Sequence, residues 1–179
     1  MRALFAAVFA LSLVACGAGP YGHAPHYVPL SEEQSAVAAA REYDPVMFQR
    51  QPDEWKKGHV SLFGIVTHRA PGPSGATALT LGVRRLEPRN LCESMRDDST
   101  CRVTVSDREF GLVHVLVTLR PDDDVGERSV GVGSLLRVVA SSGGEVDPQD
   151  GAAVLRASYY RHWPRYFYVT KAAARDLRQ

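Results

Sequence analysis

The hydrophobic pattern of this chain changes from helical to strand-like near Gly58. Before that point, residues 31–57 contain good helix formers, and we predict a helical lead-in there. Ser31 and Gln34 have capping-box spacing, which predicts a helix that begins at Ser31. The favourable run ends at Asp44-Pro45, because a helix rarely continues through the residue that precedes a proline.

Short apolar runs separated by Gly- and Pro-rich turns follow after Gly58. The predicted extended segments are residues 58–66, 77–83, 102–105, 110–119, 135–140, 153–160 and 166–169. The turn at 70–75 joins the first two as a hairpin, and residues 141–144 are expected to end the strand before them. This pattern predicts a mainly β fold, a small five- or six-stranded OB-like β-barrel over residues 58–164, with a β-sandwich as the alternative. We expect a short helical, basic and aromatic tail over residues 165–179.

The first residues of the chain have the order of a bacterial export signal. Arg2 precedes an apolar run, and Leu13-Val14-Ala15-Cys16 resembles a lipobox, the site at which bacterial lipoproteins are cleaved and acylated on cysteine. We therefore interpret residues 1–15 as a lipoprotein signal peptide, Cys16 as the lipidated residue and the Gly- and Pro-rich residues 16–30 as a flexible tether. The alternatives are an ordinary cleaved signal and a transmembrane anchor, although the apolar run is shorter than the roughly 20 residues that span a bilayer.

Charge and length narrow the class of protein. The chain has 179 residues, enough for one ordinary domain with a tether, and its net charge is +1. A nearly neutral protein lacks the basic excess of a dedicated nucleic-acid binder, so we expect no nucleic-acid partner.

Cys92 and Cys101 remain as a pair once Cys16 is assigned to lipidation. In an exported protein such a pair is most often a structural disulfide, which is our prediction here. The alternative is a metal-binding or redox pair, but redox motifs have the closer Cys-x-x-Cys spacing.

Sequence motifs for catalysis and metal binding are weak. The chain has no Gly-x-Ser-x-Gly elbow and no Ser-x-x-Lys element. Its histidines are scattered, apart from His23 and His26, and Asp122-Asp123-Asp124 lacks the ligand spacing of a calcium loop. We therefore predict no catalytic residue, no metal site and no cofactor.

Aromatic and basic residues are interleaved near the end of the last barrel strand. Such a segment either packs in the fold or forms a surface for a ligand or a membrane. The residues predicted for that surface are Tyr160, Arg161, His162, Trp163, Arg165 and Tyr166. Basic residues around and beyond it would be attracted to anionic head groups: Arg156, Arg161, Arg165, Lys171, Arg175 and Arg178.

Three groups of residues resemble motifs of the starvation-inducible outer-membrane lipoprotein (Slp) family. They are Gly58-x-Val60 with Phe63-Gly64-x-Val66, Gly133-x-Leu135-x-x-Val138, and Val154-Leu155-x-Ala157-x-Tyr159-Tyr160-x-x-Trp163-Pro164. The resemblance covers about residues 58–164 and implies a lipobox, an OB-like barrel and an envelope location rather than a particular activity.

These observations together predict a non-catalytic bacterial envelope lipoprotein with a structural or binding role. Because Gly17 rather than Asp follows Cys16, we expect the outer membrane, with the domain facing the periplasm or exposed on the surface. The expected partners are the membrane, through the lipid on Cys16, and an envelope protein or glycan. The alternatives are a periplasmic module that binds a glycan, lipid head group or small solute, and a barrel-based hydrolase.

Overall fold

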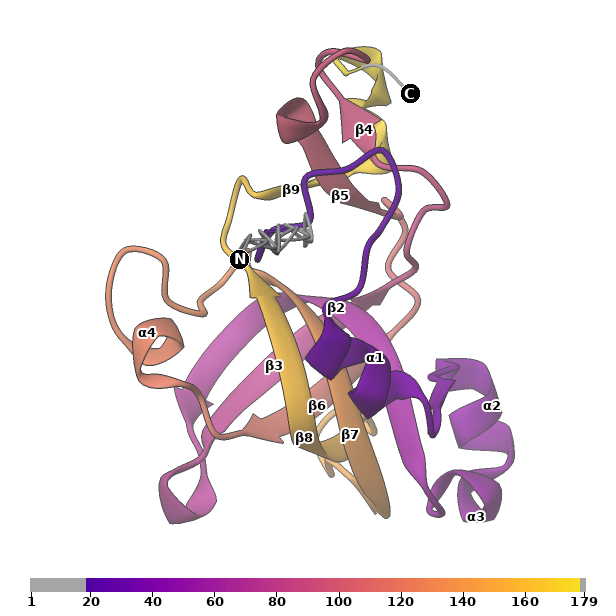
Figure 1. Ribbon diagram of the computed structural model, residues 1–179. Helices are drawn as coiled ribbons and strands as arrows, with labels where there is room; N and C mark the ends of the chain where they lie inside the picture. Colours follow the sequence, from indigo (N-terminus) through magenta and orange to yellow (C-terminus); the bar gives the residue numbers. More distant parts are fainter. Residues whose placement is uncertain (1–18, 178–179) are drawn as a thin grey trace, which may run out of the picture.

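Five strands close into a barrel in the computed structural model, which describes residues 19–177 (Figure 1). Their order around the barrel is β2-β3-β6-β8-β7, and β7 pairs with β2 to close it. Only β6 and β8 pair in parallel among these five. The strands are β2 (His59–Pro71), β3 (Thr77–Arg84), β6 (Leu112–Val117), β7 (Leu135–Val146) and β8 (Ala153–Trp163). The prediction of a mainly β, OB-like barrel with few short helices is confirmed.

Alternation of side chains along each strand fills the barrel. Leu62, Leu81, Val115, Val138 and Leu155, one from each strand, are at most 3% exposed and belong to one hydrophobic cluster. Residues two apart in a strand point to the same face, so their neighbours of the same parity also point inward. The interior is therefore a packed apolar core.

A second, smaller sheet lies beside the barrel. It contains β4 (Leu91–Cys92), β5 (Cys101–Val105) and β9 (Tyr168–Thr170), and β5 pairs with β9 in parallel. The segments predicted at 102–105 and 166–169 are thus extended, but they belong to this sheet and not to the barrel.

The second sheet explains why β2 is apolar on both faces. Phe63, which points away from the barrel interior, packs in a second cluster with Val103, Val105, Leu135 and Trp163. A strand covered on both faces has no polar side, and its sequence is therefore almost continuously apolar.

The helical lead-in is only partly helical. Helix α1 (Ser31–Val37) has Leu30 as its N-cap residue, so the predicted cap at Ser31 is wrong by one position. Glu33, and not the predicted Gln34, completes the capping box: its carboxylate accepts a hydrogen bond from Leu30 N at 3.1 Å. The chain leaves the helix well before Asp44 because β1 (Ala40–Glu42) pairs with β2 in parallel. Strand pairing outweighs helix propensity here.

Two short helices follow β1 and pack against the barrel core. Asp44 caps α2 (Pro45–Arg50) by accepting hydrogen bonds from Val46 N at 2.9 Å and Met47 N at 3.0 Å. Trp55 at the end of α3 (Pro52–Trp55) joins the same cluster as the barrel interior.

The remaining elements are short. The predicted hairpin is confirmed, because β2 and β3 pair in antiparallel fashion. They are joined through the 3₁₀ turn η1 (Pro73–Gly75), in which Ser74 has a left-handed backbone (φ 55°). The loop elements are η2 (Asp98–Thr100), α4 (Pro121–Asp124) and the tail helix η3 (Lys171–Arg175). The break predicted at 141–144 is wrong, because β7 continues to Val146 and absorbs its glycines in a register shift against β8.

Residues 19–30 lie against the end of the barrel, contrary to the flexible tether predicted there. Trp163 Nε1 donates to Tyr21 O at 3.1 Å, and Asn90 Nδ2 donates to Ala24 O at 2.8 Å. The predicted signal peptide and Cys16 lie outside the described residues. Within residues 19–177, no helix is both long and apolar enough to cross a membrane.

The predicted disulfide is present. Cys92 and Cys101 face each other across β4 and β5 and are joined by a bond between their sulfur atoms. Both residues are 1% exposed, so the bond lies inside the second sheet.

Replacing both cysteines by alanine (C92A/C101A) should lower the free energy of unfolding by about 2–3 kcal/mol, because the unfolded chain regains the entropy of this short loop. Urea unfolding followed by tryptophan fluorescence measures the change. Dithiothreitol should destabilise the wild-type protein and leave the double variant unaffected. Equal stability of the two proteins under oxidising conditions would contradict a stabilising cross-link.

Candidate functional site

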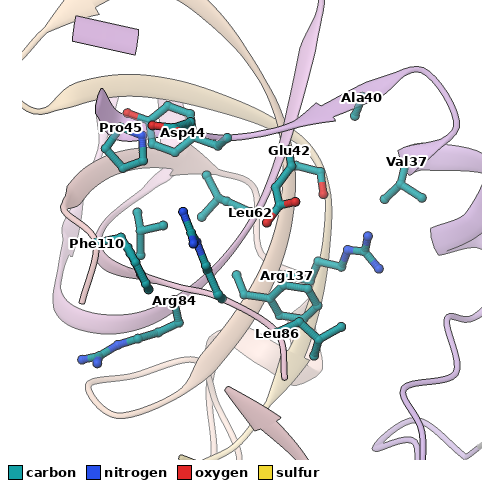
Figure 2. A pocket seen from close by; sticks show the side chains of 15 residues that line it. Val37, Ala40, Glu42, Asp44, Pro45, Leu62, Arg84, Leu86, Phe110 and Arg137 are labelled. Atoms are coloured by element: carbon teal, nitrogen blue, oxygen red, sulfur yellow. The ribbon is translucent and has the colours of Figure 1, made fainter. Parts of the chain in front are cut away.

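An open groove of about 640 Å³ lies on the outside of the barrel (Figure 2). It is bordered by β1, the chain leading to α2, the first part of β2 and the end of β3. Its apolar lining includes Val37, Phe63, Leu86 and Phe110. Its charged lining consists of Glu42, Asp44, Arg84, Arg85 and Arg137.

Arg85 is the arginine of the groove that is available to a ligand. Its guanidinium lies 4.3 Å from the centroid of the Phe110 ring, a cation–π contact that orients it. Among the described residues, its guanidinium forms no ion pair or hydrogen bond. It therefore offers a planar set of donors that matches a carboxylate or a phosphate.

The other two arginines are held from behind but keep unpaired donors. Arg84 donates to Asp107 O, and its Nη2 lies 3.6 Å from Glu109 Oε2. Arg137 Nη1 lies 2.5 Å from Glu33 Oε1. Within residues 19–177, the buried Nε atoms of both arginines have no hydrogen-bond partner. Both Nε atoms are closed to solvent, so these two arginines border the groove without offering these donors to a ligand.

The two carboxylates of the groove differ in availability. Asp44 is occupied by its capping hydrogen bonds to α2. Glu42 is exposed and forms no ion pair with any described residue. The lining thus carries three arginines and two carboxylates, and Glu42 adds an acceptor for a hydroxyl or amine of a ligand.

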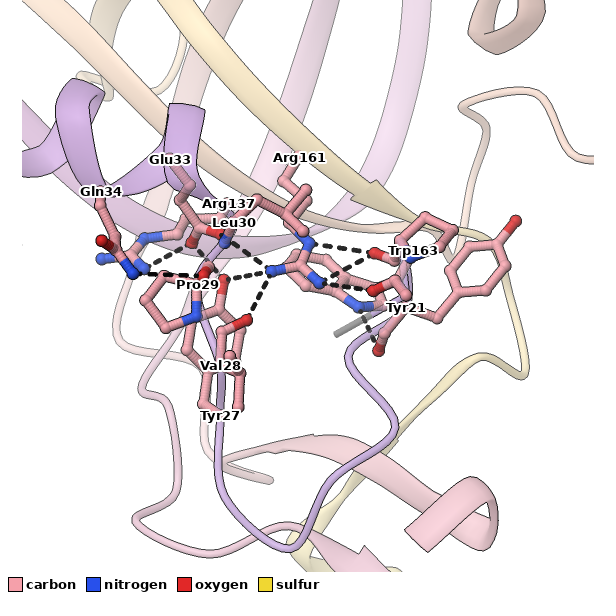
Figure 3. Close-up of polar contacts among 12 residues, drawn as sticks. Tyr21, Tyr27, Val28, Pro29, Leu30, Glu33, Gln34, Arg137, Arg161 and Trp163 are labelled. Carbon is pink, nitrogen blue, oxygen red and sulfur yellow. Dashed lines mark hydrogen bonds and ion pairs between the residues drawn. The ribbon is translucent and has the colours of Figure 1, made fainter. Parts of the chain in front are cut away.

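A buried charge cluster lies behind Arg137 (Figure 3). Glu33 is fully buried and lies between two arginines, with Oε2 2.8 Å from Arg161 Nη1. Tyr27 donates its hydroxyl to the same carboxylate. Arg161 also donates to Pro20 O at 2.9 Å and to Val28 O at 3.0 Å. These contacts hold residues 19–30 and α1 against β7 and β8.

Burial raises the pKa of Glu33. Hydrogen bonds from Tyr27, Arg161 and Arg137 together lower it by more, so the pKa of Glu33 lies below its usual value. Burial, followed by the hydrogen bond to Glu33, raises the pKa of Tyr27. The cluster therefore contains an ionised carboxylate and a neutral phenol.

Three residues form a hydrogen-bonded chain with the order of a hydrolase triad. Ser134 Oγ lies 3.0 Å from His162 Nε2, and His162 Nδ1 lies 2.8 Å from Asp123 Oδ1. Ser134, however, is 3% exposed and lies outside the groove, and its Oγ accepts a hydrogen bond from Gly131 N at 3.1 Å. Ser134 is thus closed to solvent, and these three hydrogen-bonded residues link the loop around α4 to β8.

Asp123 is the centre of that link. Burial raises its pKa, but hydrogen bonds from His162, Tyr160 and Arg120 lower it well below the usual range. Tyr160 OH and Arg120 Nε each donate to Asp123 Oδ2 at 2.8 Å. The carboxylate therefore stays ionised and anchors the loop in place.

The structure overturns most of the surface predicted from the aromatic segment. Tyr160, Arg161, His162 and Trp163 are at most 7% exposed. The barrel core covers one face of this part of β8, where Tyr160 packs, and the second cluster covers the other, where Trp163 packs. Strand periodicity alone could not reveal that both faces are covered.

Arg165 and Tyr166 do lie at the surface, and Tyr166 is 78% exposed. They follow β8 in the turn before β9. Sequence reasoning missed Arg84, Arg85 and Arg137, whose convergence depends on barrel closure. The adjacent pair Arg84-Arg85 at a predicted strand end was the available signal, and it is not specific.

No protein-family model matches the chain, and no curated protein matches it. Fold and site together define a small OB-like barrel with an arginine-lined external groove. Membership of the starvation-inducible outer-membrane lipoprotein family stays a prediction.

Replacing Glu33 by alanine should lower the free energy of unfolding by about 3–5 kcal/mol, because the buried Arg161 and the half-buried Arg137 lose their shared carboxylate. Urea unfolding measures the change. Glu32→Ala, an exposed neighbour on the same helix, is the matched control and should have little effect.

The same carboxylate should contribute to the pH dependence of stability. Its pKa is lowered by folding, so its contribution is complete above the ordinary glutamate pKa and is lost as the pH falls through the folded-state pKa. The Glu33→Ala variant should lack this part of the acid destabilisation. Parallel stability curves for the variant and the wild type would contradict the assignment.

Proposed function

We propose that the protein is a non-catalytic lipoprotein of the bacterial outer membrane whose OB-like barrel binds an anionic ligand in the groove around Arg85. The sequence supports export and lipidation through Leu13-Val14-Ala15-Cys16. The Cys92–Cys101 disulfide supports an oxidising compartment. The observation that carries the binding role is the guanidinium of Arg85, which lies over Phe110 in the groove and has no partner among residues 19–177.

The groove specifies a class of ligand. Arg85 matches a carboxylate or phosphate, and Arg84 and Arg137 line the groove beside it. Phe63 and Leu86 provide apolar surface, and Glu42 accepts a hydrogen bond from a hydroxyl. An acidic sugar of an envelope glycan and a phosphorylated lipid head group share this chemistry.

The position of the groove is consistent with the way in which OB-like barrels bind ligands. Such barrels commonly use the face of their second and third strands. Here the second strand is β3 and the third is β6, and the groove is lined by the end of β3 and by Phe110, just before β6. Binding on this face leaves the packed interior undisturbed.

The lipid anchor would hold the barrel close to the membrane. Gly19 follows Cys16 by three residues, a reach of about 10 Å. Close behind it, the Tyr21 ring stacks on Phe167 at 4.4 Å, beside the exposed Tyr166. Lipidated Cys16 would therefore bring Arg165 and Tyr166 near the head groups, the setting in which tyrosine and arginine are favourable.

The hydrolase alternative has one observation in its favour, the chain from Ser134 through His162 to Asp123. The burial of Ser134 favours the binding role instead. Labelling of the native protein by a fluorophosphonate, abolished in Ser134→Ala, would reverse this choice.

Replacing Arg85 by alanine should weaken binding of an anionic probe at least tenfold, because a bidentate charge-assisted contact is lost. The probes are D-glucuronate for carboxylates and glycerol 1-phosphate for phosphates, titrated into the purified protein and followed by NMR shift changes. Arg89→Ala removes the same charge from a nearby exposed position outside the groove and should bind like the wild type. The binding proposal fails if neither probe shifts groove residues, or if Arg85→Ala and Arg89→Ala behave alike.

Replacing Cys16 by alanine should move the protein from the outer-membrane fraction to the soluble fraction, because the acyl chains are lost. Globomycin, which blocks cleavage of lipoprotein signals, should cause the wild-type precursor to accumulate. Cys92→Ala/Cys101→Ala is the control that keeps Cys16 and should stay in the membrane. Processing that is insensitive to globomycin would contradict lipidation.

A further inference from the structure

Three metal-ligating side chains that are scattered in the sequence meet outside the groove. His114, Asp147 and Asp150 each offer one ligand atom, and these atoms all lie within 4.8 Å of one another. His114 Nε2 lies 2.9 Å from Asp150 Oδ2. None of the three lines the arginine groove.

The barrel topology brings these residues together. His114 lies on β6 opposite Val154 of β8 in the parallel pairing. Asp147 and Asp150 lie in the turn that connects β7 to the start of β8. Parallel pairing of β6 with β8 therefore places this turn beside the histidine.

Backbone hydrogen bonds hold both carboxylates in place. Asp147 Oδ1 accepts from Gln149 N at 2.8 Å, and Asp150 Oδ1 accepts from Ala152 N at 2.9 Å. The turn is closed by a hydrogen bond from Asp147 N to Ala152 O at 2.8 Å. Each aspartate thus uses one oxygen in the turn, and the second oxygen of Asp150 contacts His114 Nε2, the atom beside which an ion would bind.

The histidine is oriented by a residue outside the cluster. His114 Nδ1 lies 3.2 Å from Thr80 Oγ1, and Thr80 is its direct neighbour across the β3–β6 pairing. A hydrogen bond at one ring nitrogen directs the other toward a ligand, as the second shell of a metal site does. No Lys or Arg among residues 19–177 forms an ion pair with Asp147 or Asp150, so their charge is left to be balanced by another cation.

We propose that His114, Asp147 and Asp150 bind a divalent transition-metal ion of the zinc type. One imidazole nitrogen and two carboxylate oxygens suit Zn²⁺, Co²⁺ or Mn²⁺. Calcium, which takes about six to eight oxygen ligands, fits this set poorly. The inference does not depend on the proposed lipoprotein or ligand-binding roles, and it differs from the absence of a metal site predicted from the sequence.

The site is open on one side. The side chains of His114 and Asp150 are 24% and 36% exposed, which leaves access for the ion and for water as a further ligand.

The test is titration of ZnCl₂ and CoCl₂ into the purified, tag-free protein in mild detergent, by calorimetry for zinc and by visible absorption for cobalt. We expect one zinc ion per chain and a cobalt spectrum with nitrogen and oxygen ligation. His114→Ala and Asp150→Asn should each weaken zinc binding at least tenfold. CaCl₂ should not compete at equal concentration.

His68→Ala is the matched control, because His68 is an exposed histidine on β2 that lies outside the cluster. It should bind zinc like the wild type. Circular dichroism and urea unfolding verify that each variant is folded, and Asp147→Asn replaces any variant that is not. The proposal is overturned if the wild type binds no zinc, or if His114→Ala and the aspartate variants bind it as tightly as His68→Ala does.

Discussion

The carboxylate of Glu33, buried between Arg137 and Arg161, is the contact on which the arrangement of this molecule depends. It joins α1 to two neighbouring barrel strands, and Arg161 extends the link to the backbone of residues 19–30. Buried ion pairs add little net stability compared with apolar packing, but a broken one is expensive. The main effect of the cluster is therefore to fix the N-terminal segment in one position on the barrel.

That position determines the groove. Because α1 is held on β7 and β8, the chain that follows it runs as β1 along β2 and places Glu42 at the rim. Arg137 serves both sites, since it lines the groove while its Nη1 pairs with Glu33. A substitution in the buried cluster should consequently change the position of Arg137 in the groove, because Arg137 belongs to both sites.

Much of the barrel was predictable because strand periodicity is a local property. The alternation in residues 58–66 and 77–83, with a Pro- and Gly-rich turn between them, predicts the hairpin that the structure confirms. The errors arise where distant segments compete for the same chain. Ala40–Glu42 favours a helix locally but pairs with β2, and Gly143-Gly144 resembles a strand end but is carried through by pairing with β8. Burial of Arg161 was likewise invisible, because its partner Glu33 lies far away in the sequence.

What the sequence determined by itself is the class of fold, the pairing of Cys92 with Cys101 and the motif around Cys16, because each depends on residues close together in the chain. The tertiary structure alone decided which side chains meet. Arg85 meets Phe110 only after β3 and β6 pair in antiparallel fashion, and His114 meets Asp150 only after β6 and β8 pair in parallel. Binding chemistry requires donors within a few ångströms of one another in space. Spacing along the chain carries that information only when the ligands share one element.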